Sequence, residues 1–183
     1  MSTIVKPHRL LILACSNVKR VSVRPMPARD RYDGPLWQTL RRVDPLEQKA
    51  RVAFVSARCG FRAASSPVEQ YDCLLTEEIA GRMKAGGLGT RWPRPDIHRG
   101  IILPREHAGK HIHAMTRGGA KPFDDVCMVG GALYVDVMRH FVALFRERGY
   151  VTPSAVVTEI CAPIGIMRQR MTGWLDRPAG GGS

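Results

Sequence analysis

Three short polar turns contain the side chains of this sequence that are best suited to chemistry. Cys15 to Lys19 follows one continuous apolar run, Ser56 to Gly60 follows a second, and Gly130-Gly131 follows a third. Because the carboxyl ends of parallel strands meet at one edge of a sheet, these turns are expected to converge. The sequence therefore predicts one site, with these substrate-binding candidates in the turns themselves: Cys15, Ser16, Lys19, Ser56, Arg58, Gly130 and Gly131.

The first and third turns leave several roles open. A catalytic thiol at Cys15 needs a base that holds it as thiolate, and no histidine is placed to do so, which favours a small residue packed at a strand end. Lys19 is a phosphate anchor, the amine of a Schiff base or a solvated lysine. Gly130-Gly131 either presents free amides to an anion at a helix start or makes a simple tight turn.

Acidic residues are scarce beside these turns, which makes the few present informative. Asp72 comes after the second turn, and Asp30 and Asp33 come after the first. A carboxylate among many cations has its charged form stabilised, which suits a group that holds a developing positive charge or orients water. For Asp72 this catalytic role and a capping or surface role remain equally open, whereas Asp33 is expected to cap a helix. Three tyrosines either stack on a base or belong to the core: Tyr32, Tyr71 and Tyr134.

The charge balance of the chain points to a polyanionic partner. Its 183 residues include 28 Lys and Arg against 16 Asp and Glu, a net charge of +12. Each cation placed at a phosphate releases a counterion, so nucleic acid is the leading partner, and a solubility surface is the alternative. The basic, glycine-rich segment 86–122 supplies the expected DNA contacts, namely Arg91, Arg94, Arg99, Arg105, Lys110, Arg117 and Lys121.

Other classes of protein fit the sequence less well. No stretch approaches the roughly 20 apolar residues of a membrane span, and the first residues are too polar for a secretory signal, so a cytoplasmic protein is expected. The five cysteines are odd in number and widely spaced, which favours reduced thiols over disulfides. His107, His111 and His113 lack a carboxylate or cysteine at convincing spacing, so no metal or cofactor is expected, and these histidines should face phosphates or solvent.

The elements that must position these groups follow from hydrophobic periodicity. Buried strands are expected at Arg9–Ala14, Val52–Val55 and Val126–Val129, and a last strand begins at Val156. Helical spacing is found after Pro35, from Val68 to Lys84, after Gly131 and around Met167 to Leu175, while 86–122 reads as an excursion with few buried positions. The predicted fold is one α/β domain over residues 1–178, a three-layer sandwich with a mostly parallel sheet, followed by a tail at 179–183.

Several pieces, taken in order, resemble a known family. Cys15 to Lys19, Pro27 to Tyr32, Ser56 to Phe61, Tyr71 to Leu74 and Gly130 to Tyr134 are similar to motifs of small bacterial and phage domains of unknown function distantly related to the YaaA peroxide-stress proteins. The resemblance covers about residues 9 to 148 and implies a uracil-DNA-glycosylase-like fold linked to modified bases and anti-phage defence. It also implies site roles for Asn17, Lys19, Tyr32, Tyr71, Asp72 and Tyr134. The sequence departs from the pattern at Cys59 and in the long basic segment.

These observations lead to one leading hypothesis and two rivals. The leading one is a DNA N-glycosylase that extrudes a modified base, with Asp72 stabilising the sugar cation and orienting water and Asn17 donating to the departing base. It should leave an intact abasic strand, with Lys19 as a phosphate anchor. The rivals are an enzyme that cleaves or transfers the N-glycosidic bond of free nucleosides or nucleotides, and a nucleic-acid-binding module without chemistry.

Overall fold

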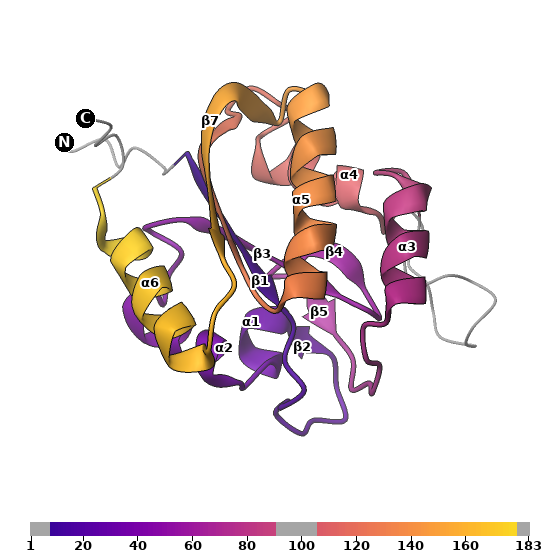
Figure 1. Cartoon of the computed structure of the whole chain (residues 1–183). Coiled ribbons are helices and arrows are strands. Elements are labelled where there is room, and N and C mark those ends of the chain that lie inside the picture. The colour runs from indigo at the N-terminus through magenta and orange to yellow at the C-terminus, as the bar shows by residue number, and fades with distance from the viewer. Residues whose placement is uncertain (1–7, 91–105, 179–183) are drawn as a thin grey trace.

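The computed structural model describes residues 8–90 and 106–178, and a five-stranded sheet forms its centre (Figure 1). The strand order is β4-β3-β1-β6-β7. Strands β1 (Arg9–Ala14), β3 (Arg51–Ser56), β6 (Phe123–Val129) and β7 (Val151–Ile160) run parallel, and only β4 (Gly60–Ala63) is antiparallel to its neighbour. The expectation of an α/β protein with a mostly parallel sheet is confirmed.

The central strand β1 shows why the sheet needs cover on both faces. All six of its residues are buried. Alternate side chains enter two separate cores, with Leu10 and Ile12 in one and Leu11 and Leu13 in the other. A continuous apolar run is what a parallel strand buried on two faces requires.

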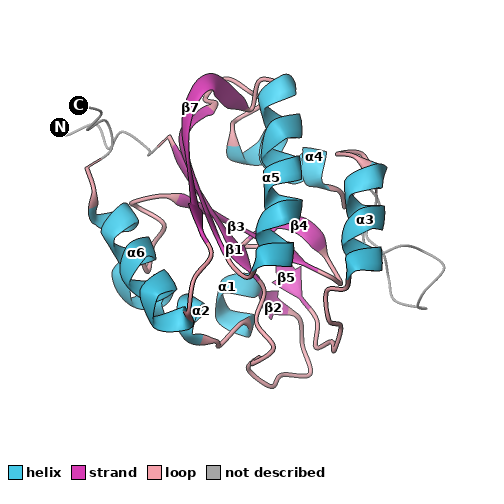
Figure 2. Cartoon of the chain, in the orientation of Figure 1, coloured by secondary structure: helices cyan, strands magenta, loops and turns pink. Residues whose placement is uncertain are grey.

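The helices supply this cover (Figure 2). The core that contains Leu10 is completed by α3 (Glu77–Gly86), α4 (Ala108–Met115) and α5 (Ala132–Glu147). The core that contains Leu11 is completed by α1 (Ala28–Arg31), α2 (Pro35–Val43) and α6 (Ile164–Asp176). A small antiparallel pair, β2 (Met26–Pro27) with β5 (Pro67–Val68), lies beside α1.

One expected helix is mostly extended chain, so that prediction was wrong over its first half. Instead of spanning Val68 to Lys84, the helix begins after Thr76, whose hydroxyl accepts a hydrogen bond from the amide of Ile79. Before it, Tyr71, Cys73 and Leu75 are at least half-buried while the residues between them are exposed. This two-residue alternation is that of extended chain, and the apolar residues at 71 and 75 imitated helical spacing.

The expected cap at Asp33 was also wrong. Gly34 is the N-cap residue of α2 and makes no side-chain cap bond. The Asp33 carboxylate instead accepts a hydrogen bond from Arg41, which lies on α2, and faces Arg20 at 3.4 Å. Ion pairing with two arginines therefore replaces capping of the helix.

The basic segment 86–122 contains more buried structure than its composition suggested. Helix α4 buries Ala108, His111, Ile112 and Met115 against β4 and the core. The ring of His111 contacts Glu106 at 2.7 Å, and His107 caps α4 by accepting the amide of Lys110. The expectation that these two histidines face phosphates or solvent was therefore wrong, because α4 uses both in its own structure.

Strand β7 forms one edge of the sheet and is irregular at its start. Phe123 pairs with Val151, but Asp125 pairs with Val156, so four residues of β7 bulge out opposite one residue of β6. Arg146 of α5 donates hydrogen bonds to the carbonyls of Thr152 and Ala155 in this bulge. The irregularity is thus held by a specific side chain.

Candidate functional site

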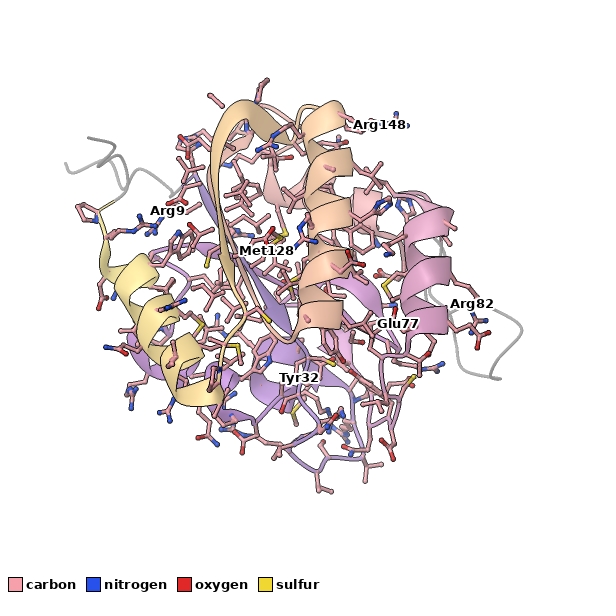
Figure 3. The ribbon with its side chains drawn as sticks, in the orientation of Figure 1. Arg9, Tyr32, Glu77, Arg82, Met128 and Arg148 are labelled. Carbon is pink, nitrogen blue, oxygen red and sulfur yellow. The ribbon has the colours of Figure 1, made fainter. Side chains whose placement is uncertain are left out.

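The three polar turns do converge at the carboxyl edge of the sheet. The amide of Cys15 donates to the carbonyl of Val55 at 3.0 Å, and the amide of Gly130 donates to that of Ile160 at 3.1 Å. A Cβ atom on Gly130 would lie 2.9 Å from that of Ala14, so this turn needs glycine for close packing. In Figure 3 Tyr32 lies at this end of the sheet and Arg9, the first residue of β1, at the other.

Five side chains from these turns and the segments beside them form what we call the hydroxyl cluster, namely Cys15, Tyr32, Ser56, Tyr71 and Tyr134. The hydroxyl oxygens of Tyr32 and Tyr71 are 2.6 Å apart, and Cys15 Sγ lies 3.1 Å from Tyr134 Oη. Ser56 and Cys15 also lie near enough to Tyr71 to influence its ionisation. The structure therefore brings together five of the residues singled out from the sequence.

The hydroxyl cluster is uncharged near neutral pH. Burial raises the pKa of Cys15, although hydrogen bonds with Tyr134 and Tyr71 oppose the change. Burial likewise raises the pKa of Tyr32, Tyr71 and Tyr134. These groups offer neutral hydrogen-bond donors and acceptors, and the Cys15 thiol is not a ready nucleophile.

Lys19 lies at the exposed side of the hydroxyl cluster. Its ammonium is 4.4 Å from the centre of the Tyr71 ring, within the range of a cation–π contact. Its backbone forms a bridge with Tyr32, and the neighbouring amide of Arg20 donates to the carbonyl of Arg31. Among the described residues Lys19 has no carboxylate partner, so its charge is available to an anion.

Arg31 organises this region, and the sequence analysis gave it no role. Its side chain is fully buried and donates hydrogen bonds to the carbonyls of Arg20, Arg24 and Val68 and to the side chain of Gln70. It therefore ties the basic loop after β1 to the segment that leads into Tyr71. Its position next to Tyr32 was the signal that the sequence offered, since its lack of a carboxylate partner among residues 8–90 and 106–178 is seen only in the structure.

The two proposed catalytic residues lie outside the hydroxyl cluster. Asp72 is exposed, since the extended segment points Tyr71 and Cys73 inward and the residue between them outward. Asn17 is exposed as well, while Ser16 accepts a hydrogen bond from the amide of Val18. Arg58 is half-buried in the turn after β3. Asp72 and Asn17 are thus found on the solvent side of the site.

The three predicted DNA-binding cations that the structure describes do not gather at this site. Lys110 pairs with Glu106 at 2.9 Å on α4. Arg117 and Lys121 precede β6 and so lie at the amino edge of the sheet, opposite the hydroxyl cluster. The remaining predictions lie outside the described residues, namely Arg91, Arg94, Arg99 and Arg105.

Comparisons with known proteins add no relative. No protein-family model matches the chain, and neither a curated protein nor a solved structure does. Across residues 8–90 and 106–178, no three or more His, Cys, Asp or Glu side chains gather as metal ligands would. In the same ranges no helix has the length and apolar character of a membrane span.

Proposed function

We propose that this protein is a DNA N-glycosylase that binds an extruded, modified base at the carboxyl edge of its sheet. The observation that carries the proposal is the hydroxyl cluster, an uncharged group of donors and acceptors beside Lys19, on a chain with a net charge of +12. A base needs neutral, directional hydrogen bonds, and its nucleotide needs a cation at the phosphate.

The hydroxyl cluster suits the base and its departure. The side chains of Tyr71 and Tyr134 are partly exposed, and their hydroxyls carry no charge near neutral pH, so a base that displaces a bond within the cluster would meet neutral groups. When the N-glycosidic bond breaks, its electron pair leaves with the base, which becomes anionic. Hydroxyl donors placed around that anion stabilise it.

The basic side chains around the carboxyl edge of the sheet would bind the phosphates of DNA. Lys19, Arg20, Arg24 and Arg58 come from two of the turns and the loop after β1, and Arg31 holds that loop in place. Binding that depends on such contacts weakens steeply with salt. The duplex would supply the phosphates while the target nucleotide rotates toward the cluster.

Asp72 is the carboxylate that would stabilise the cationic sugar. It directly follows Tyr71 and is exposed, so DNA can reach it. Its negative charge would stabilise the cationic sugar, and it would accept the proton of the water that attacks the anomeric carbon. The same proton, or one from solvent, then neutralises the departed base.

We also propose that the fold is a three-layer sandwich like that of uracil-DNA glycosylases. A three-layer sandwich of the uracil-DNA-glycosylase kind would present its strand ends to DNA as described here. The helices on both faces of the sheet and the four parallel strands support it. The resemblance to domains related to the YaaA proteins supports it through the motifs of the three turns.

A nucleic-acid-binding module without chemistry is the second candidate. The exposure of Asp72 and Asn17 favours it, because neither side chain contacts the hydroxyl cluster in the free protein. Under this alternative Lys19 and its neighbours anchor phosphate and the cluster recognises a base without cleaving its bond.

The test is incubation of the protein with DNAs that carry different base modifications, followed by measurement of abasic sites. Asp72→Asn keeps the size of the side chain but removes its charge, and should lower turnover at least about 100-fold with binding preserved. Asp124→Asn is the matched control, since Asp124 is exposed at the opposite edge of the sheet. Full activity of Asp72→Asn would remove the carboxylate role, and no abasic sites on any DNA would favour the binding module.

Lys19 distinguishes plain hydrolysis from strand cleavage. As a phosphate anchor it gives no covalent intermediate, so borohydride should trap no protein–DNA adduct and Lys19→Ala should weaken binding more than turnover. An adduct that disappears in Lys19→Ala would show instead that this amine forms a Schiff base.

A further inference from the structure

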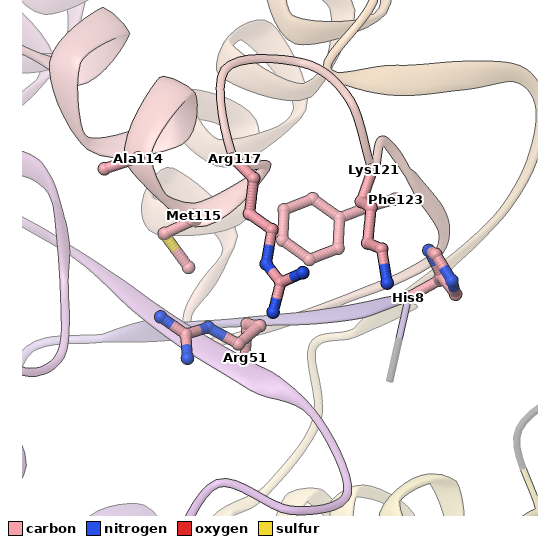
Figure 4. Close-up of a pocket in the computed structure, with 7 residues that line it drawn as sticks. All are labelled: His8, Arg51, Ala114, Met115, Arg117, Lys121 and Phe123. Carbon is pink, nitrogen blue, oxygen red and sulfur yellow. The ribbon is translucent and has the colours of Figure 1, made fainter. Parts of the chain in front are cut away.

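A pocket lies at the amino edge of the sheet, where the strands begin. It has a volume of about 80 Å³ and is lined by four basic side chains, His8, Arg51, Arg117 and Lys121, together with the apolar side chains of Met115 and Phe123 (Figure 4). No acidic side chain lines it. The pocket is therefore a concave site with charge of one sign.

The sheet itself brings these cations together. Arg51 opens β3, and its position is opposite Leu10 of β1. His8 precedes β1, and its carbonyl accepts the amide of Asp124 at the start of β6. Parallel neighbours begin at one edge, so basic residues far apart in sequence meet there.

The basic side chains of this pocket have no partner among the described residues. Within residues 8–90 and 106–178, none of the four makes an ion pair or a side-chain hydrogen bond. The Nε–H of Arg51 is buried and has no acceptor. Buried donors are nearly always satisfied in folded proteins, so this N–H is free to donate to an acceptor that enters the site.

The loop that carries Arg117 and Lys121 is held in one shape. Thr116 is fully buried, and its hydroxyl donates to the carbonyl of Ile112 and accepts the amide of Gly119. The amide of Lys121 donates to the carbonyl of Thr116 at 3.0 Å. Arg117 has a φ of 52°, a left-handed conformation uncommon for this residue type. In Figure 4 its guanidinium extends from this loop toward Arg51.

The size and charge of the pocket define its ligand. A volume of about 80 Å³ exceeds the roughly 30 Å³ share of one water. It is far below the roughly 300 Å³ at which pockets begin to enclose a drug-sized molecule. The pocket thus takes one anionic group while the rest of the ligand stays outside. Guanidinium groups match tetrahedral oxyanions through paired N–H donors, and several cations favour a dianion over a single carboxylate.

We propose that this amino-edge pocket binds the phosphate group of a phosphate monoester. The monoester is either a free nucleotide or the 5′-phosphorylated end of DNA, which share the same dianionic group. The proposal does not depend on glycosylase activity, because its residues lie at the other edge of the sheet from the hydroxyl cluster.

Calorimetry with inorganic phosphate in low-salt buffer tests the pocket first. The double variant Arg117→Gln, Lys121→Gln should weaken phosphate binding at least tenfold. The matched control Arg42→Gln, Arg170→Gln removes two exposed, unpaired arginines on α2 and α6 and should change binding less than twofold. The proposal is overturned if phosphate does not bind saturably, or if both double variants weaken it equally, which would show general attraction to a basic protein.

Two further arms identify the source of the phosphate. Thymidine 5′-monophosphate is compared with thymidine, and a short duplex with 5′-phosphates is compared with the same duplex without them. For the natural ligand, the phosphorylated form should bind the protein at least tenfold more tightly than the form without phosphate. The double variant Arg117→Gln, Lys121→Gln should bind the two forms equally. If neither gains, the assignment to a monoester is wrong even where inorganic phosphate binds.

Discussion

The two edges of the sheet present opposite kinds of polar group. At the carboxyl edge the hydroxyl cluster is neutral, largely buried and bonded within itself. At the amino edge the pocket is lined by Arg51, Arg117 and Lys121, whose charged groups pair with no described residue, together with His8 and apolar side chains. One edge is thus satisfied without a ligand, and the other is not.

This difference suggests separate places for base recognition and for phosphate binding, which the composition alone cannot distinguish. A net charge of +12 does not say where an anion binds. The structure places a pocket lined by basic side chains away from the edge where α/β proteins usually bind ligands. In our two proposals, recognition of a base and capture of a phosphate group therefore belong to different ends of the same strands.

The largest expected difference between the edges is in stability. Arg31→Met should lower the free energy of unfolding by about 3 kcal/mol, because several buried carbonyls lose a charged donor. At the other edge, Arg117→Met should change it by about 0.5 kcal/mol or less, since that side chain is exposed. Urea unfolding of both variants measures the contrast. Equal losses would show that the loop after β1 does not depend on Arg31.

Cysteine alkylation tests whether the carboxyl edge is uncharged. The exposed Cys161 should react with iodoacetamide at least about tenfold faster than Cys15 at pH 7.5, because burial raises the pKa of the Cys15 thiol and shields it. Mass spectrometry of the labelled peptides gives both rates. The Cys15 rate should still rise beyond pH 9. A plateau already below pH 7 would instead indicate a reactive thiolate and support covalent catalysis.

Removal of one phenol hydroxyl should have a smaller effect. Tyr71→Phe leaves the hydroxyl of Tyr32 without its partner at 2.6 Å and should cost about 1 kcal/mol of stability. The Lys19 contact with the ring is retained. Tyr150→Phe is the matched change, because the Tyr150 hydroxyl makes an exposed bond with His113 and should matter less. Thermal or urea unfolding that ranks the two variants in the reverse order would contradict the comparison.

The smallest expected effect is a loosening of the amino edge in acid. Burial lowers the pKa of His111, and the pKa of Glu106 is about 2, because bonds from Lys110 and His111 and nearby charges outweigh burial. Both values lie below those of the unfolded chain, so their stabilisation is present at neutral pH. It is lost as pH falls below about 6.5 for His111 and from about 4.5 toward 2 for Glu106.

Hydrogen exchange at pH 7 and pH 4 measures this effect. Amides of α4 and of the loop from Thr116 to Lys121 should lose protection at pH 4. Amides around Cys15 should not, because the pKa values of the hydroxyl cluster are raised and none of its groups titrates in this range. Equal losses at both edges would show that acid acts on the whole fold.

The parts of the fold set by long apolar patterns could be predicted from the sequence. Strands β1, β3 and β6 and helix α5 each have an unbroken run or a full stripe of apolar residues, and the meeting of their turns follows from a parallel sheet. Shorter elements were missed. Strand β4 begins directly at Gly60, whose φ of 64° allows the reversal, and the sequence shows only a polar turn there.

The sites were predictable to different degrees. Cys15, Lys19 and Ser56 follow strand ends, so their position identified them. The three tyrosines were singled out as rings that could stack on a base and through the family resemblance. Arg51 and Arg117 are ordinary arginines in a chain with many, and only the register of β1, β3 and β6 brings them together. The exposure of Asp72 depends on the extended segment before α3, which helical spacing had concealed.

The bulge in β7 has a consequence for how two molecules would meet. An edge strand with regular, unpaired amides is a template onto which another chain can add and begin aggregation. Four residues of β7 depart from the ladder near its start, and Pro153 among them has no amide hydrogen to offer. A neighbouring strand could therefore not continue the hydrogen-bond ladder along this part of the edge. The bulge thus works against strand-by-strand growth of a protein whose sheet core is rich in valine, isoleucine and leucine.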